Sequence, residues 1–80
     1  MADAWVYILR CGDGSLYTGW TNDLAKRIEA HSAGLGSRYT RSRLPVELAA
    51  SFAMEDRSAA QREEVRIKRL SRADKLALIG

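Results

Sequence analysis

The sequence of 80 residues is poor in cysteine and has no long apolar run. Its one cysteine, Cys11, cannot form an internal disulfide, and it excludes metal sites built from paired cysteines. No segment approaches the roughly 20 apolar residues that a membrane-spanning helix needs. The first residues also lack the basic start and the small-residue cleavage site of a signal peptide. We therefore expect a soluble, cytoplasmic protein that makes no membrane contact, in keeping with a reducing compartment.

Hydrophobic residues make up 46% of the chain, which is enough for one small core. We expect a single domain over residues 1–80, because a chain of this length has no room for a second core. A domain of this size buries only ~60% of the surface of its unfolded chain. Most apolar positions should therefore already be used by the core.

Positive charge is clustered, although the formal net charge is only +3. Residues 36–43, "GSRYTRSR", carry three arginines and no acid, and residues 57–75 carry seven basic side chains against three acidic ones. Such clusters suit a nucleic-acid phosphate backbone. An ordinary solvated surface gives the same pattern, and charge alone favours that simpler interpretation.

Three segments are typical of β-strands. Residues 4–11, "AWVYILRC", are β-branched, aromatic and apolar on both parities, which predicts a buried strand. The glycines of "GDG" at 12–14 indicate a turn, so residues 15–20 become the second strand of a hairpin. In residues 46–54, apolar side chains occupy every second position, which predicts a third strand with one buried face. Its inward positions are Val46, Leu48, Ala50, Phe52 and Met54.

A helix is predicted over residues 22–33, followed by a polar loop that ends near Pro45. Thr21 or Asn22 is the expected N-cap, with Asp23 in the first turn, where the helix dipole favours negative charge. Glycines 34 and 36 end the helix. The apolar side chains expected to face the core are Leu24, Ile28 and Leu35.

Two further helices are predicted after the third strand. Ser58 and Gln61 resemble a capping box that opens a helix over residues 58–70. Ser71 begins a short final helix, from which Leu76 and Ile79 should pack inward. The order is ββαβαα, which predicts an α+β fold with helices covering a small sheet.

Several polar side chains fall where the pattern expects core residues. Tyr7 and Tyr17 lie on the same face of the hairpin in any register with an odd-length loop. Arg27 and His31 are four residues apart and share one helical surface with apolar positions. Taken singly, each residue also has a simpler interpretation. The tyrosines could be core residues whose hydroxyls reach solvent, and the histidine could lie at the edge of the core with its hydrogen bonds satisfied. The arginine could pack its aliphatic stem on the core and keep its charge in solvent.

The helix over residues 58–70 can turn one of two adjacent carboxylates toward this group. The helical pattern places Glu63 slightly nearer the inner face than Glu64, and either could instead pair along the helix with a basic neighbour. A carboxylate can hold Mg²⁺, an arginine can stabilise a phosphate, and a phenol or imidazole can accept a proton from water. Together these groups would suit hydrolysis of a phosphodiester.

These segments resemble the GIY-YIG endonuclease superfamily, specifically its small stand-alone bacterial UPF0213 group. "WVYIL" is similar to the first motif of the family and "YTG" to the second, while "TNDLAKRIEAH" is similar to the helix that carries the arginine and histidine. "GSRYTRSRLPVEL" and "EVRIKRLSRADKLALI" resemble the loop, third strand and C-terminal helices of the stand-alone group. The resemblance covers almost the whole chain and aligns the metal-binding glutamate of the family with Glu64.

The resemblance implies a three-stranded antiparallel sheet flanked by helices, and cleavage of nucleic-acid backbones with one Mg²⁺ or Mn²⁺ ion. Glu64 would ligate the metal, and Arg27 would stabilise the transition state. Tyr7 and Tyr17 would position or deprotonate the attacking water, with either one as the base, and His31 would assist proton transfer. Nucleic acid, with DNA as the expected substrate, would contact the basic loop through Arg38, Tyr39, Arg41 and Arg43.

The chain departs from the family pattern at three places. Trp5 stands where the first motif has glycine, Thr18 replaces the isoleucine of the second, and no residue matches the asparagine that some members carry near the domain end. We expect a structure- or damage-directed nuclease, because 80 residues leave little with which to read bases. The alternatives are a binding module of the same fold with little activity, and a subunit that docks on a larger repair or recombination protein.

Overall fold

The computed structural model describes residues 2–80 and contains one antiparallel sheet with the strand order β2–β1–β3. The strands are β1 (Ala4–Arg10), β2 (Leu16–Thr21) and β3 (Glu47–Met54). β1 lies in the centre and is covered on both faces, which explains why its apolar residues occupy both parities. The three-stranded antiparallel α+β fold predicted from the sequence is confirmed.

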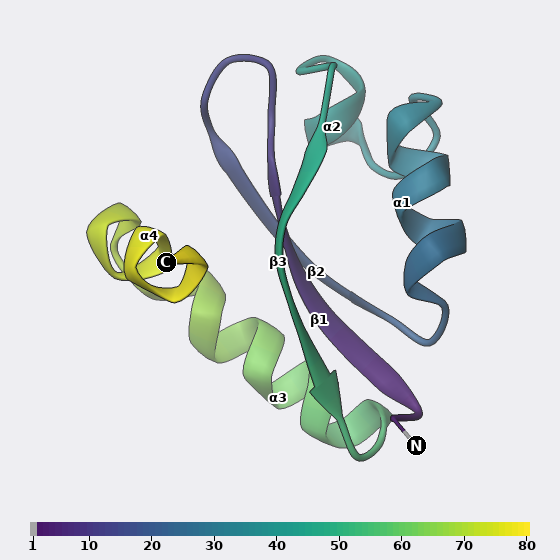
Figure 1. The fold of residues 1–80 in the computed structure, drawn as a ribbon, viewed down its shortest axis with the longest axis vertical. Coiled ribbons are helices and arrows are strands. Elements are labelled where there is room, and N and C mark those ends of the chain that lie inside the picture. The colour runs from purple at the N-terminus through teal and green to yellow at the C-terminus, as the bar shows by residue number, and fades with distance from the viewer. Residues whose placement is uncertain (1) are drawn as a thin grey trace.

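Helices cover both faces of the sheet (Figure 1). α1 (Leu24–Ser32) and α2 (Arg38–Arg41) lie on one face, and α3 (Arg57–Lys68) and α4 (Arg72–Ile79) lie on the other. The order is therefore ββααβαα, with α2 added to the predicted ββαβαα. α2 is a single helical turn within the segment expected to be a loop, and it forms because the Ser37 side chain accepts a hydrogen bond from the Thr40 N–H.

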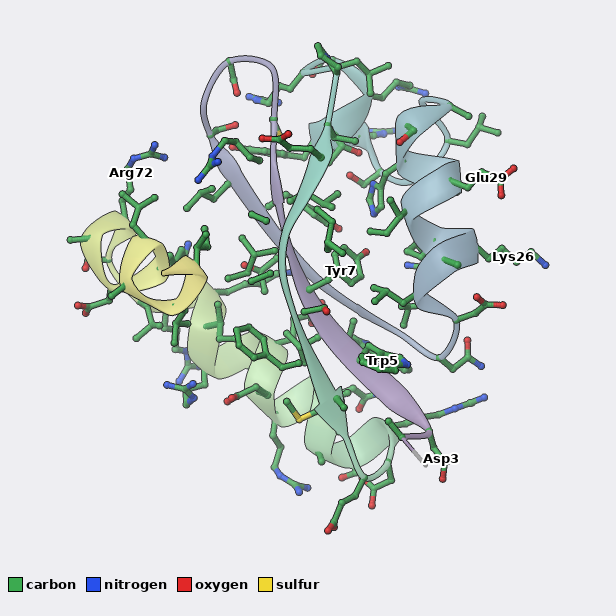
Figure 2. The ribbon with its side chains drawn as sticks, viewed as in Figure 1. Asp3, Trp5, Tyr7, Lys26, Glu29 and Arg72 are labelled. Atoms are coloured by element: carbon green, nitrogen blue, oxygen red, sulfur yellow. The ribbon has the colours of Figure 1, made fainter. Side chains whose placement is uncertain are left out.

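Alternation along β1 divides the interior into two unlike layers. Val6 and Ile8 pack against Ala60 and Ile67 of α3 and form an apolar core. Tyr7, between them, points to the opposite face, where it lies between the sheet and α1 (Figure 2). The apolar core therefore sits under α3 and α4, while the layer under α1 contains polar groups.

The N-caps of two helices differ from the sequence prediction. Asp23, rather than Thr21 or Asn22, caps α1 and accepts a hydrogen bond from the Lys26 N–H at 3.1 Å. Asp56, rather than Ser58, caps α3 by accepting from the Ala59 N–H. A carboxylate also interacts with the positive end of the helix dipole, which favours aspartate over the nearby neutral alternatives. Ser71 caps α4 as predicted.

A bulge in β3 overturns the predicted burial of Leu48. Ile8 pairs with Ala50, but the next residue of β1, Leu9, pairs with Leu48, so Ala49 is the extra residue. One inserted residue reverses the side-chain alternation on one side of the bulge. Leu48 therefore leaves the face of Ala50 and is 43% exposed.

Two further leucines expected in the core lie outside it. Leu35 is 82% exposed, because α1 has already ended and Gly34, with φ of +81°, redirects the chain. Leu76 is also exposed, and Leu78 packs against the apolar core beside the correctly predicted Ile79. Both errors come from extending a helical stripe by counting residues without knowing where the helix begins and ends.

The turn between β1 and β2 is tied to distant parts of the chain. The Gly12 N–H donates to the Arg43 carbonyl oxygen at 2.7 Å, and the Arg43 side chain donates to the Asp13 carboxylate at 3.1 Å. Arg72, at the start of α4, donates to the Gly14 carbonyl oxygen. A Cβ at position 12 would lie 2.6 Å from the Leu44 carbonyl oxygen, so this close approach requires glycine.

No helix within residues 2–80 is long and apolar enough to cross a bilayer.

The Thr18→Val variant should be more stable than the parent. The Thr18 hydroxyl is buried and has no hydrogen-bond partner within residues 2–80, so removing it without changing the side-chain shape should add about 1 kcal/mol to the free energy of unfolding. Urea unfolding would show a higher midpoint with an unchanged slope.

Thr21→Val is the matched control for this measurement. The Thr21 hydroxyl is also buried, but it accepts a hydrogen bond from the Asp23 N–H and donates to the Asp23 carbonyl oxygen. Its loss should lower the unfolding midpoint. A fall in the midpoint of Thr18→Val would contradict the assignment of an unsatisfied hydroxyl.

Candidate active site

Tyr7 occupies the centre of the layer between the sheet and α1. It lies on β1 opposite Gly19 of β2, and its side chain is fully buried. A Cβ at position 19 would lie 2.5 Å from the Tyr7 hydroxyl oxygen. The glycine of "YTG" is thus required because the phenol of the neighbouring strand lies across its backbone.

His31 holds the Tyr7 hydroxyl from the opposite side. Its Nε2 is 2.9 Å from the Tyr7 hydroxyl, and its Nδ1 is 2.9 Å from the Thr40 hydroxyl in α2. The imidazole is fully buried and packs against the backbone of Gly36, where any Cβ would overlap Nδ1. Residues from β1, α1 and α2 are therefore joined by one buried hydrogen-bond chain.

One assignment of the protons satisfies every group in this hydrogen-bond chain. The Thr40 hydroxyl also lies 3.0 Å from the Ser37 hydroxyl and 3.4 Å from the Ser37 carbonyl oxygen. Every group is satisfied when Thr40 donates to Ser37, His31 Nδ1–H donates to Thr40, and the Tyr7 hydroxyl donates to His31 Nε2. Nε2 is then the acceptor that faces the phenol.

Burial keeps both Tyr7 and His31 neutral. It raises the pKa of Tyr7 from 10.0 to about 12, with the neighbouring Tyr17 adding to the rise, Arg27 opposing it and Glu64 making the smallest contribution. Burial also lowers the pKa of His31 below 6.5, and the positive charge of Arg27 acts in the same direction. The phenol is therefore a poor proton acceptor unless it can pass its own proton to Nε2.

Tyr17 lies beside this pair and completes an aromatic cluster. Its ring centroid is 6.5 Å from that of Tyr7 and 5.3 Å from that of His31. Tyr39 of α2 stacks on it at 5.8 Å with an interplanar angle of 30°, and Lys68 of α3 reaches to 5.9 Å from the ring centroid. The predicted sharing of one face by Tyr7 and Tyr17 is confirmed.

Arg27 and Glu64 reach the same centre from two helices. Arg27 is exposed on α1, yet its charge acts on the pKa of both Tyr7 and His31. Glu64 comes from α3, which packs against β2, and its charge contributes to the raised pKa of Tyr7. Tyr7, Tyr17 and His31 therefore lie in direct proximity, and the charges of Arg27 and Glu64 act on Tyr7.

The mild helical preference for Glu63 over Glu64 is wrong. The Glu63 carboxylate receives two hydrogen bonds from Arg66, which lower its pKa and hold it along the helix surface. The Glu64 side chain is 20% exposed, and its Oε2 lies 3.7 Å from Lys68 Nζ. A helical wheel could not separate two adjacent residues without the orientation of α3 over β2.

The donor set suits a metal that takes few protein ligands. Within residues 2–80, no three histidine, cysteine, aspartate or glutamate side chains come together as a complete metal site. Glu64 instead offers one partly exposed carboxylate, whose charge acts on Tyr7. Mg²⁺ is commonly held by one or two carboxylates, with water and substrate phosphates filling the other positions. Glu64 therefore fits a single ion of this kind.

The predicted nucleic-acid residues of the basic loop divide into two groups. Arg38 and Arg41 are exposed and pair with no carboxylate within residues 2–80. Arg43 is already engaged, because it pairs with Asp13, donates to the Tyr39 carbonyl oxygen, and lies 3.9 Å from the centroid of the Tyr39 ring. Tyr39 is thus held between the loop and Tyr17.

Sequence reasoning did not identify Thr40 or Gly36 as part of the site. Both lie in the segment expected to be a polar loop, and neither belongs to a periodic pattern. A buried threonine next to a basic, exposed stretch gives no signal in the sequence alone. The contact of Thr40 with His31 spans nine residues and depends on the single turn of α2.

The family model described as the GIY-YIG catalytic domain matches residues 3–77. Curated relatives include a UPF0213 protein of Clostridium perfringens, 55% identical over 95% of this chain and 82% of its own, and one of Halobacterium salinarum, 49% identical over 91% and 95%. The chain therefore belongs to the GIY-YIG family, within its UPF0213 group.

A solved structure agrees with this assignment. The solution NMR structure of a UPF0213 protein from Bacillus halodurans is similar to this chain, with a TM-score of 0.62 and 46% identity. The alignment covers 95% of this chain and 81% of the other. The likeness therefore extends over almost the whole of this chain.

The stability of the fold should fall as the pH drops through the ordinary pKa of histidine. The pKa of His31 is lowered in the folded state, so below about pH 6.5 the unfolded chain binds a proton that the folded chain does not. The unfolding midpoint in urea should therefore be lower at about pH 5.5 than at about pH 7.5.

His31→Gln should remove most of this pH dependence. His31 is the one histidine of the chain, so no other side chain of that type titrates in this range. An NMR titration of its ring protons would give the folded-state pKa directly. A pKa above 6.5, or a midpoint that rises on acidification, would contradict the buried neutral imidazole.

Proposed function

We propose that this protein is a metal-dependent endonuclease that hydrolyses phosphodiester bonds in nucleic acid, with structurally distorted or damaged DNA as the substrate. The observation that supports the proposal most strongly is the 2.9 Å contact between the Tyr7 hydroxyl and His31 Nε2, placed beside Arg27 and Glu64. This combination offers a proton acceptor, a fixed positive charge and a metal-binding carboxylate around one point.

Tyr7 and His31 act as a pair in the proposed reaction. The oxygen of a water molecule bonds to phosphorus while one phosphorus–oxygen ester bond breaks. The proton of the water passes to the Tyr7 oxygen as the Tyr7 proton passes to Nε2, and the leaving oxygen takes a proton from solvent. The raised pKa of Tyr7 makes this transfer necessary, because a free phenolate is not populated near neutral pH.

Arg27 and Glu64 stabilise the charge that develops on the phosphate. The Arg27 guanidinium donates hydrogen bonds to phosphate oxygens, and Glu64 holds Mg²⁺ or Mn²⁺. When bound, the ion would neutralise negative charge on the phosphate. Lys68 Nζ lies 3.7 Å from a Glu64 carboxylate oxygen and balances its charge in the protein alone.

Glu64→Ala and Arg27→Ala should each lower the rate of Mg²⁺-dependent cleavage by roughly 10²- to 10³-fold, the usual cost of losing one group that stabilises developing charge. Rates would be measured with labelled branched, nicked and single-stranded DNA, and with RNA of the same sequences.

Glu63→Ala is the matched control for the carboxylate. It removes the same charge from the adjacent position, but its carboxylate is directed at Arg66. This variant should keep the parent rate. The nuclease proposal fails if the parent cuts none of these substrates faster than Glu64→Ala does.

A binding module with little activity is the second candidate. It is favoured by the exposed Arg38 and Arg41 side chains and by the ion pair that already occupies Glu64. Under this proposal the Glu64→Ala protein binds nucleic acid with the parent affinity, and the parent also shows no turnover.

Arg38→Ala and Arg41→Ala should each reduce the salt dependence of binding under either candidate function. One lost phosphate contact lowers the slope of log K against log salt concentration by about 0.7 to 0.9. Fluorescence anisotropy of a labelled oligonucleotide over a range of salt concentrations would give the slope. Unchanged slopes in both variants would remove the loop from the nucleic-acid interface.

A further inference from the structure

A polar pocket lies next to the candidate active site, at the end of the sheet where β2 leads into α1. Its lining consists of Trp20, Thr21, Asn22, Arg27 and Arg57. These residues come from β2, the β2–α1 connection, α1 and the first turn of α3. Figure 1 shows that the start of α1 and the start of α3 lie toward the same end of the sheet.

The pocket is positively charged and has no acidic lining residue. Arg27 and Arg57 each contribute a guanidinium, and neither pairs with a carboxylate within residues 2–80. The two nearest carboxylates in the sequence, Asp23 and Asp56, accept hydrogen bonds from the Lys26 and Ala59 N–H groups as helix caps. Both guanidinium groups are therefore available to bind an anion.

The donor groups of the pocket match an anion with several oxygens. Two guanidinium groups can donate forked hydrogen bonds, which fit phosphate geometry, and the exposed Asn22 amide adds a neutral donor. Thr21 does not compete, because its hydroxyl is committed to the Asp23 backbone. A phosphate is a better fit than a carboxylate, since it offers more acceptor oxygens to three separate donors.

Arg27 belongs to both the pocket and the candidate active site. The same guanidinium that lines the pocket acts on the pKa of Tyr7 and of His31. A group bound in the pocket therefore lies on the flank of the catalytic centre, on the side away from the basic loop of α2.

We propose that this pocket is a second phosphate subsite, which binds a backbone phosphate of the nucleic-acid strand next to the scissile one. The inference rests on the proposed function and extends it to the path of the substrate. Arg57 and Asn22 hold the flanking phosphate, and Arg27 bridges it to the phosphate at the reacting centre. Two adjacent phosphates held in this way fix the direction of the strand across Tyr7 and Glu64.

Arg57→Ala in the Glu64→Ala background tests the subsite by binding alone, without cleavage. We expect weaker binding of a labelled oligonucleotide and a salt slope lower by about 0.7 to 0.9, which corresponds to one lost phosphate contact. Asn22→Ala should weaken binding with no change of slope, because the amide is uncharged.

Arg62→Ala is the matched control. It removes the same charge from the exposed surface of α3, where its guanidinium donates to the Ser58 hydroxyl and does not line the pocket. Its salt slope should equal that of the Glu64→Ala parent. If Arg57→Ala and Arg62→Ala give the same slope, the subsite is overturned while the nuclease proposal stands.

A titration with inorganic phosphate and with a dinucleotide gives an independent measurement on the full chain. The Trp20 indole N–H and the Asn22 amide signals should shift in the parent and in Arg62→Ala, and should shift much less in Arg57→Ala. Equal shifts in Arg57→Ala and the parent would overturn the subsite. Failure of the Glu64→Ala protein to bind any oligonucleotide at low salt would overturn both the subsite and the proposed function.

Discussion

The buried hydrogen-bond chain from Tyr7 through His31 to Thr40 determines how one whole face of this protein is assembled. His31 is the one fully buried residue of α1, and Thr40 is the one fully buried residue of α2. These two helices therefore dock on the sheet largely through polar groups in place of an apolar stripe. Such a network stabilises only when every member is satisfied, so its geometry is narrowly defined.

The two faces of the sheet consequently contribute to the structure in different ways. Under α3, Val6 and Ile8 meet apolar partners, and the layer contributes stability with little demand on direction. Under α1, directional hydrogen bonds fix the phenol and the imidazole within a space cleared by glycines. One strand, β1, supplies both layers by simple alternation. Tyr7 and His31 thus rest on a rigid support whose other side is apolar, while Glu64 acts on the site from α3.

The sequence predicted the parts of this arrangement that depend on local pattern. Strand alternation located the sheet, and the odd-length turn placed Tyr7 and Tyr17 on one face. It could not predict features that depend on non-local geometry. The bulge at Ala49 reversed Leu48, and the orientation of α3 over β2 decided between Glu63 and Glu64. The roles of the site residues, by contrast, were suggested by family resemblance and stay predictions.

The hydrogen bonds of the β1–β2 turn to distant segments limit where the chain can be engineered. Short hairpin turns at the surface are normally the safest places to insert a tag or to open a chain for circular permutation. Here the turn is bonded to Arg43 and to Arg72, which lie far along the sequence. The turn holds the segment after α2 and the start of α4, so an insertion at residues 12–14 would loosen the attachment of both segments at once.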